Sequence, residues 1–272
     1  MHKERAKAVW GTTPAGTTWG GGAKPGTKEF FQNVLEKRFI YEVPWLLQLV
    51  PFASFNKMKV LELGCGAGYD AYQFCRNGSD YFGIDIAPAN IERVKKYLGL
   101  YGYEPKVIEG DVENLPFEGN SFEVIFSFGV LHHTPDIAKS LLEAHRVLRP
   151  EGEFYVIVYH KNSIFYWITL LLFNHYLRFG FMKQRFKERL SMIEYTTNQE
   201  LPLVNAYTRR ELRKMLEDSG FAVESLWVRK LVKEDLPAIY GLERLWRFIP
   251  HACLDFAGKY FGWYLIVKAK KM

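Results

Sequence analysis

The stretch VLELGCGAGYD, Val60–Asp70, places three glycines between an apolar run and a helical pattern. It predicts a short buried strand over 58–63 that runs into Gly64, Gly66 and Gly68 and then into a helix. Glycines at such a turn let the backbone bend sharply and let a ligand approach it closely. The free N–H groups that open the helix suit an anionic ligand, so this turn alone is compatible with a nicotinamide or flavin site.

Strand and helix patterns alternate along the chain after this turn. Apolar runs predict further strands at 80–85, 106–110, 122–128 and 152–159. Helical patterns lie between them at 69–76, 89–101 and 135–148. Continuous apolar strands that alternate with helices predict an α/β fold, in which a parallel sheet is covered by helices on both faces.

The later part of the chain is less regular. Ser163 to Met182 is apolar, but its unbroken apolar core, Ile164 to Phe173, is shorter than the roughly 20 residues of a membrane span and suits a buried or interfacial helix. Residues 182–190 have a basic amphipathic pattern. Thr208 and Glu211 form a capping-box pattern at the start of another helix. Strands are then predicted at 222–228 and 263–269, with a helical segment over 236–260 between them.

The N-terminal segment predicts helical structure over 28–49, interrupted at Pro44. Before it, the glycine-rich stretch 11–26 is expected to be a flexible loop, either a leader or a lid that folds over a site with Trp19 as its apolar anchor. The charged opening residues lack the apolar stretch of a signal peptide.

Composition limits the number of domains, the cellular compartment and the classes of ligand that fit this interpretation. The chain has 272 residues, of which 48% are apolar and 24% charged, which fits one or two folded domains. Three cysteines exclude a disulfide framework and fit a reducing compartment, so a cytoplasmic location is expected. A net charge of +6 and an aromatic content of 16% are compatible with binding nucleic acid, a membrane surface or an aromatic or lipid-like small molecule.

Three acidic residues surround the glycine turn. Glu62 precedes the glycines, Asp85 ends the second strand, and Asp111 follows the third. The spacing is GxGxG, with Tyr69 where a dinucleotide fingerprint expects its last glycine. A carboxylate beside the turn repels a pyrophosphate and attracts a cation. The arrangement therefore suits a nucleoside that carries a positive amine and no phosphate.

These residues carry a family resemblance. Together with four further motifs, the run Glu62–Gly68 resembles the class I S-adenosylmethionine-dependent methyltransferases, in particular the small-molecule branch that includes the quinone C-methyltransferases. The further motifs are Gly83–Asp85, Gly110–Phe117, Ser121–Asp136 and His145–Phe154. The resemblance implies a Rossmann-like, mostly parallel seven-stranded sheet with an antiparallel last strand, helices on both faces and helical cap insertions. It also implies S-adenosyl-L-methionine as cofactor, S-adenosyl-L-homocysteine as product, and an O, N or C atom of a small aromatic or lipid-like molecule as methyl acceptor.

The resemblance further implies roles for single residues, although each could also be a simple turn, cap or packing residue. It places Glu62, Gly64, Cys65, Gly66 and Gly68 at the methionine part of the cofactor. It places Asp85 at the ribose hydroxyls, Ile86 and Val112 against the adenine, and Asp111 at the adenine amino group. Ser127, Phe128 and Gly129 would line the side from which the methyl group leaves.

A general base is needed only where the methyl acceptor must lose a proton. His132 and His133 follow the fourth strand on the ligand side of the sheet and are the candidates, with His133 preferred. One histidine could instead cap the helix that begins near Pro135 while the other packs beneath it. A metal site with Asp136 is not expected, because no further ligand cluster is present. Tyr159, His160 and Trp19 are candidates for the substrate side.

The substrate class is narrowed by two absences from the sequence. The fourth strand ends in SFGV, which lacks the Asn/Asp-Pro-Pro-aromatic motif of amino-methylating DNA enzymes, and no Pro-Cys nucleophile is present. A nucleic-acid substrate is therefore not expected. A protein or peptide side-chain methyltransferase and a non-catalytic S-adenosylmethionine-binding protein remain as alternatives, and the oligomeric state stays open.

Charge and tryptophan are distributed unevenly over the expected segments. We divide the chain into 1–56 (lid loop and helices), 57–160 (cofactor-binding core), 161–206 (helical cap insertion) and 207–272 (the rest of the core, with a helical insert at 235–261). Residues 57–160 hold ten basic and fifteen acidic residues and none of the seven tryptophans. The sequence thus predicts an acidic cofactor module with a basic, tryptophan-bearing cap. Such a cap favours an apolar or aromatic acceptor and is compatible with peripheral membrane contact.

Overall fold

The computed structural model describes residues 2–12, 16–177, 186–192, 201–237 and 243–272. Within these residues the strands form one seven-stranded sheet in the order β3-β2-β1-β4-β5-β7-β6. The strands are β1 Lys59–Leu63, β2 Asp80–Asp85, β3 Lys106–Glu109, β4 Phe122–Phe128, β5 Leu148–Tyr159, β6 Phe221–Arg229 and β7 Tyr264–Lys271. Neighbours from β3 to β5 pair in parallel, and β7 is antiparallel to both β5 and β6. The predicted sheet with an antiparallel last strand is confirmed.

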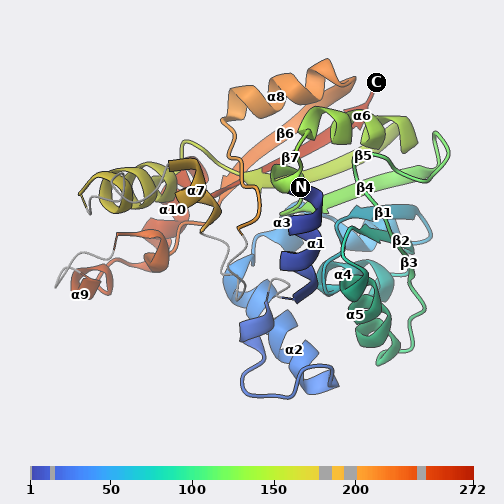
Figure 1. The fold of residues 1–272 in the computed structure, drawn as a ribbon, viewed down its shortest axis with the longest axis horizontal. Helices are drawn as coiled ribbons and strands as arrows, with labels where there is room; N and C mark the ends of the chain where they lie inside the picture. Colours follow the sequence, from blue (N-terminus) through green and yellow to red (C-terminus); the bar gives the residue numbers. More distant parts are fainter. Residues whose placement is uncertain (1, 13–15, 178–185, 193–200, 238–242) are drawn as a thin grey trace.

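Helices cover both faces of this sheet (Figure 1). Those of the core are α4 Tyr69–Arg76, α5 Pro88–Gly99, η4 Leu131–His133, α6 Ile137–Val147 and α8 Arg209–Asp218. The N-terminal segment forms α1 His2–Thr12, η1 Thr17–Trp19, α2 Lys28–Glu36, η2 Lys37–Glu42, α3 Leu46–Leu49 and η3 Phe52–Phe55. The later insertions contain η5 Phe165–Leu177, α7 Phe186–Ser191, η7 Lys233–Asp235, α9 Glu243–Trp246 and α10 His251–Phe261.

Alternation of side chains along the strands creates two apolar cores. On β1, Val60 points to a cluster that includes residues of α2, α4 and α5, whereas Leu61 and Leu63 point to a second cluster under α6 and α8. Because period-two alternation sends successive side chains to opposite faces, a strand buried on both sides must be apolar throughout. This is the continuous apolar pattern that the sequence shows.

The helical segment 28–49 is interrupted as predicted. Helix α2 continues into the π-helical turn η2, which ends at Glu42, and α3 begins only at Leu46, after Pro44. The capping box is also confirmed, because Thr208 accepts a hydrogen bond from the Glu211 N–H and the Glu211 side chain accepts from the Thr208 N–H.

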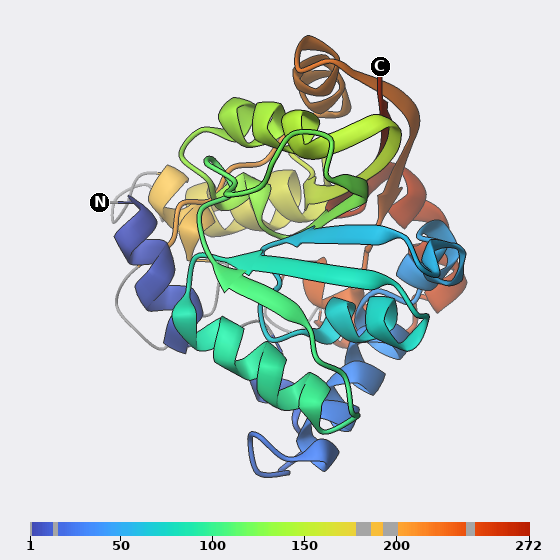
Figure 2. The same cartoon turned by 90° about the vertical axis from the view of Figure 1, so that its right-hand side faces the viewer.

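Helix α1 is a feature that the hydrophobic pattern does not predict. Only Val9 of this helix is buried, so the segment lacks the apolar stripe of a core helix. In the glycine-rich stretch 11–26, Gly11 and Thr12 end α1, and Thr17–Trp19 form the short helix η1. Residues 13–15 of that stretch lie outside the described residues. Figure 2 shows α1 at the edge of the sheet where the strands end.

The remaining insertions gather beyond the carboxyl end of β5, where η5, α7, α9 and α10 lie together (Figure 1). No helix in the described ranges is long and apolar enough to cross a membrane. Parts of the predicted apolar segment 163–182, the basic turn 182–190 and the helical insert lie outside the described residues.

Candidate functional site

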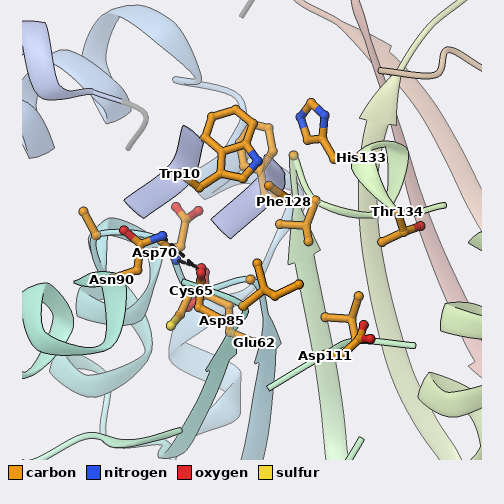
Figure 3. Close-up of a pocket in the computed structure, with 18 of the residues that line it drawn as sticks. Trp10, Glu62, Cys65, Asp70, Asp85, Asn90, Asp111, Phe128, His133 and Thr134 are labelled. Atoms are coloured by element: carbon orange, nitrogen blue, oxygen red, sulfur yellow. Dashed lines mark hydrogen bonds between the residues drawn. The ribbon is translucent and has the colours of Figure 1, made fainter. Parts of the chain in front are cut away.

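A pocket opens where the carboxyl ends of β1, β2 and β4 meet, with β3 and β5 beside them. This is the edge at which parallel α/β sheets bind ligands. Figure 3 shows Trp10 and His133 at one side of the pocket and Asp85 on its floor. The residues that line it are His2, Lys3, Ala6, Trp10, Arg38, Glu42, Glu62, Gly64, Cys65, Gly66, Ala67, Tyr69, Asp70, Asp85, Ile86, Asn90, Gly110, Asp111, Val112, Glu113, Phe128, Gly129, Val130, His133, Thr134, Pro135, Tyr159 and Tyr264.

The glycines of the turn differ in what surrounds them. Gly64, Gly66 and Gly68 all have positive φ. A Cβ on Gly64 would lie 2.2 Å from the Val130 side chain, whereas a Cβ on Gly66 would meet no described atom within 4 Å. Gly64 is therefore required by packing. The space beside Gly66 belongs to the pocket, as expected where a ligand contacts the backbone.

Asp85 organises the pocket floor. One oxygen of its buried carboxylate accepts from the Gly66 N–H at 2.9 Å, and the other accepts from the Ala87 N–H at 2.9 Å and from the Asn90 side chain at 3.1 Å. Burial raises the pKa of Asp85, while the hydrogen bonds from Ala87, Gly66 and Asn90 oppose that rise. The carboxylate thus ties the glycine turn to the start of α5 and faces the pocket.

Asp111 lies on the loop after β3 and contacts α1. Its carboxylate accepts from the Glu113 N–H at 2.9 Å, so it is also a turn residue. The Lys3 ammonium lies 2.5 Å from an oxygen of Asp111 and 2.5 Å from an oxygen of Glu113. Burial lowers the pKa of Lys3, but the hydrogen bonds and charges of both carboxylates outweigh it and raise that pKa overall.

A buried charged network lies beside the glycine turn. The Glu62 carboxyl accepts from the Tyr81 hydroxyl at 2.6 Å, and burial, with the nearby charge of Asp70, raises the pKa of Glu62 well above its ordinary value. Asp70 accepts two hydrogen bonds from the Arg38 guanidinium, which is also buried. Burial opposes the charge of Arg38, but the carboxylates of Asp70 and Glu42 raise its pKa.

The two adjacent histidines have different surroundings. His133 lines the pocket, its Nδ1 lies 2.6 Å from the Leu203 carbonyl oxygen, and its ring lies 5.0 Å from that of Trp10. His132 is fully buried beneath it, with its ring 3.8 Å from that of Tyr159. Burial lowers the pKa of His132 well below its ordinary value. Of the two rings, only that of His133 can reach a ligand in the pocket.

Most of the residues predicted for the site line this pocket. Those that do are Glu62, Gly64, Cys65, Gly66, Asp85, Ile86, Asp111, Val112, Phe128, Gly129, His133 and Tyr159. Within the described lining, Gly68, Ser127, His132, His160 and Trp19 are not included. Gly68 precedes α4, Ser127 is buried with its hydroxyl toward the Leu63 carbonyl, and His160 bonds the Gly262 carbonyl at 3.0 Å. Trp19 packs against the core on the α2 side.

Sequence reasoning missed the contribution of the N-terminal segment. Lys3 and Trp10 reach the pocket from α1, Arg38 and Glu42 reach it from η2, and Tyr264 reaches it from β7. None of these residues belongs to a local motif, because each is brought to the site by packing over a long sequence separation. The one signal in the sequence is that the apolar helical pattern over 28–49 also contains the charged residues Arg38 and Glu42.

Comparisons with known proteins show which family part of the chain resembles. Residues 61–156 match the family described as a methyltransferase domain, which confirms the predicted resemblance for this part of the chain. The phthiotriol/phenolphthiotriol dimycocerosates methyltransferase of Mycobacterium leprae is 36% identical over 117 residues, covering 42% of this chain and 43% of the relative. The ubiquinone biosynthesis O-methyltransferase of Azorhizobium caulinodans is 28% identical over 123 residues, covering 45% of this chain and 46% of the relative.

The fold extends beyond that region. An S-adenosylmethionine-dependent methyltransferase from Mesorhizobium loti superimposes with a TM-score of 0.55 at 18% identity, covering 85% of this chain and 97% of that structure. At this identity the likeness shows the fold alone. The chain spans less than half the length of the two curated relatives described above.

Proposed function

We propose, from the match of residues 61–156 to the methyltransferase-domain family, that this chain is an S-adenosyl-L-methionine-dependent methyltransferase. The observation that carries the proposal is the acidic surface around the glycine turn. There Asp85 accepts a hydrogen bond from the Gly66 N–H, and no described atom lies within 4 Å of the position that a Cβ on Gly66 would take. We infer that the methyl acceptor is a small aromatic or lipid-like molecule.

The residues present fit this cofactor. Asp85 lies at the end of β2, where a carboxylate can accept hydrogen bonds from ribose hydroxyls. We assign Asp111 to the adenine amino group, with the side chains of Ile86 and Val112 against the adenine faces. Glu62 and the backbone of the glycine turn are assigned to the methionine part, whose ammonium suits an acidic surface.

When bound, this cofactor supplies an electrophilic methyl group on a sulfonium sulfur. The chain's own contribution is to position the substrate in line with that group and to keep water out, and positioning of this kind can supply much of the rate. Phe128, Gly129 and Tyr159 are assigned to the side that faces the substrate. Where the acceptor atom must lose a proton, His133 is the proposed base, and the buried ring of His132 supports its position.

The substrate class is supported by the relatives and by the walls of the pocket. One curated relative is named as a methyltransferase of phthiotriol and phenolphthiotriol dimycocerosates, and the other as an O-methyltransferase of ubiquinone biosynthesis. We propose the broad substrate class, a lipid-like or aromatic small molecule, for this chain, and not those particular compounds. Aromatic side chains of Trp10, Phe128, Tyr159 and Tyr264 line the pocket. Apolar walls with a few polar groups are typical of sites for flat or hydrophobic molecules.

We also propose that the protein works in the cytoplasm with its cap at a membrane surface. The three cysteines are free thiols, which fits a reducing compartment. Large apolar side chains on η5 and α10, among them Trp167, Leu172 and Phe256, are 47%, 46% and 64% exposed. Contact with lipid would cover these side chains and bring a lipid-like substrate to the pocket.

Calorimetric titration with S-adenosyl-L-methionine tests the cofactor assignment. The substitution Asp85→Ala removes a charged hydrogen-bond acceptor, for which the loss is about 1.5–3 kcal/mol, or roughly 10- to 150-fold in affinity. Asp80→Ala, at the opposite end of the same strand, is the matched control and should bind as the wild type does. Equal affinity for the two variants would remove the basis of the assignment.

Turnover separates the enzyme from a sensor. Purified protein incubated with a lipid extract and the cofactor should release S-adenosyl-L-homocysteine faster than the Asp85→Ala variant does. Tight cofactor binding without any turnover on lipid, phenolic or peptide pools would instead favour a non-catalytic binding protein. Turnover on peptide pools alone would favour the protein-methylating alternative.

A further inference from the structure

The wall of the pocket includes an acidic side chain that the cofactor assignment does not use. Glu42 is the last residue of η2, and it lines the pocket together with Phe128 and Tyr264. Its side chain is 17% exposed, yet its Oε2 atom is buried and has no hydrogen-bond partner within the described parts of the chain. Buried polar atoms of folded proteins are nearly always hydrogen-bonded, so an orphaned carboxylate oxygen in a pocket wall points to a donor supplied by a ligand.

Two cations lie near this carboxylate without satisfying it. The Arg38 guanidinium is 3.6 Å from Oε2, and the Lys230 ammonium is 3.9 Å from Oε1. Both distances exceed that of a hydrogen bond. Arg38 is committed to Asp70 by two hydrogen bonds, so it is not free to turn toward Glu42.

The formal charges of this group cancel. Among the four groups that pair directly, Arg38 and Lys230 are positive, and Glu42 and Asp70 are negative. The buried carboxyl groups of Glu62 and Asp235 also act on Arg38 and Lys230, and burial raises the pKa of both carboxyl groups. An ammonium ligand would place a third cation beside the buried Arg38 and Lys230, and like charges repel strongly in a low-dielectric site. A neutral hydroxyl supplies the missing donor without changing the balance of charge.

Aromatic rings form the walls beside Glu42. The Arg38 guanidinium lies 4.6 Å from the centre of the Phe128 ring, and the Lys230 ammonium lies 5.1 Å from that of Tyr264. The Phe128 and Tyr264 rings contact each other edge to face at 5.2 Å, and Tyr159 lies 5.8 Å from Tyr264. The two cations thus hold both the carboxylate and its aromatic walls in place.

We propose that Glu42 is a specificity-determining residue that accepts a hydrogen bond from a neutral hydroxyl of the substrate, whose apolar body packs against Phe128, Tyr159 and Tyr264. This subsite rests on the proposed function, since it places the substrate beside the cofactor site. It selects a free hydroxyl over the corresponding ether and over a cationic amine.

Three matched probes test the subsite, each titrated into protein loaded with S-adenosyl-L-homocysteine. They are 4-octylphenol, its methyl ether 4-octylanisole, and the cationic 4-octylbenzylamine. The wild-type protein should bind the phenol at least tenfold more tightly than the ether, because a hydrogen bond to a charged group is worth more than one between neutral groups. The amine should bind no more tightly than the ether.

Glu42→Gln tests whether this carboxylate is responsible. The variant should reduce the preference for the phenol over the ether to threefold or less, and Glu42→Leu should abolish it. Glu36→Gln, an exposed residue at the end of α2, is the matched control and should keep the wild-type preference. Affinity for the ether should be the same in all three proteins that carry Glu or Gln at position 42.

The outcomes separate this subsite from the proposed function. Equal affinity for phenol and ether in the wild type, an unchanged preference in Glu42→Gln, or tighter binding of the amine overturns the subsite. If Glu42→Gln weakens all three probes equally, Glu42 only holds Arg38 in place and the subsite is also wrong. Failure of the wild type to bind S-adenosyl-L-homocysteine at all would overturn the proposed function instead.

Discussion

Single residues of the glycine turn divide into those that fold the protein and those that leave room for a ligand. A motif cannot make this division, because Gly64 and Gly66 occur in the same run and both have positive φ. The surroundings of each Cα distinguish the two glycines, because Val130 fills the space next to Gly64, whereas the space next to Gly66 is part of the pocket. Substitution by alanine should therefore have different consequences at the two positions.

Gly64→Ala should destabilise the fold, by roughly 2–4 kcal/mol, because the new Cβ overlaps Val130 and the residue must keep a left-handed conformation. Gly66→Ala should lower the free energy of unfolding by only about 1–2 kcal/mol, which is the cost of holding an alanine in the left-handed conformation. It should nevertheless weaken S-adenosyl-L-homocysteine binding at least tenfold. Urea denaturation and calorimetry on both variants measure the two effects. Equal stability losses, or unaltered binding by Gly66→Ala, would show that the two glycines do not differ as we describe.

His160 gives the stability of the protein a pH dependence. Burial lowers its pKa to about 4, although the Gly262 carbonyl partly opposes this shift. Because the unfolded histidine titrates near 6.5, the unfolded state takes up a proton first as the pH falls. The stabilisation conferred by the neutral ring is therefore complete above pH 6.5 and is lost progressively between pH 6.5 and 4.

The contribution of His160 can be measured by urea denaturation at pH 7.5 and pH 5. The free energy of unfolding should fall by more in the wild type than in His160→Gln, with a difference on the order of 1–2 kcal/mol. The control is His251→Gln, because that histidine is exposed on α10. It should retain the wild-type pH dependence. An identical fall in all three proteins would assign the effect to other groups.

Among the helices, α1 depends on charge for its position more than on apolar packing. Lys3 bridges Asp111 and Glu113, Lys7 lies 2.9 Å from Glu109, and the Gly11 carbonyl accepts from Arg93 at 2.7 Å. Arg93 in turn donates to Asn90, which bonds Asp85, so the end of α1 is linked to the pocket floor. The helix covers the assigned cofactor site with contacts that water and salt can replace.

Lys3→Gln should loosen α1 without unfolding the sheet. Ion pairs at partly exposed positions contribute about 1 kcal/mol or less each, so amide hydrogen exchange over residues 2–12 should accelerate about fivefold. Raising NaCl from 25 to 500 mM should accelerate exchange more in the wild type than in the variant, which keeps the Lys7–Glu109 ion pair. Arg5→Gln, exposed on the same helix, is the control. Salt-independent exchange of α1 in the wild type would contradict this account.

The elements that the sequence predicts well are those whose order follows from local patterns. The strands over 80–85 and 122–128 coincide with β2 and β4, and the Thr208 capping box marks the start of α8. Helix α1 escapes prediction because its partners, such as Asp111, lie about a hundred residues away. The same reason hides Arg38 and Tyr264, whereas Asp85 is predictable because strand, turn and helix follow one another along the chain.

At the scale of the whole molecule, acidic and basic residues separate by function. The core over 57–160 has a net charge of −5, and the remaining segments together carry +11. An acidic core suits a cationic cofactor, and a basic exterior suits an anionic partner. Exposed aromatic and aliphatic side chains concentrate on η5, α9 and α10 and in the segments next to them. Of these, the insertion 161–206 has a net charge of +3, whereas the insert 235–261 is neutral. Apolar side chains flanked by basic residues are typical of proteins that bind at a membrane interface.

Vesicle co-sedimentation tests whether these apolar and basic surfaces bind a membrane. The wild type should bind vesicles containing phosphatidylserine at 50 mM NaCl, bind less at 300 mM, and bind weakly to vesicles of phosphatidylcholine alone. Replacing Trp167, Phe248 and Phe256 with serine should lower the partition coefficient at least tenfold, because these side chains are 47%, 81% and 64% exposed and each would bury apolar area in the interface. The matched control replaces Leu100, Ile108 and Leu142, which are 39%, 38% and 54% exposed on the core, and it should bind as the wild type does. Equal losses in the two triple variants would mean that no particular face meets the membrane. An absence of binding at low salt would mean that the insertions serve only to enclose the pocket.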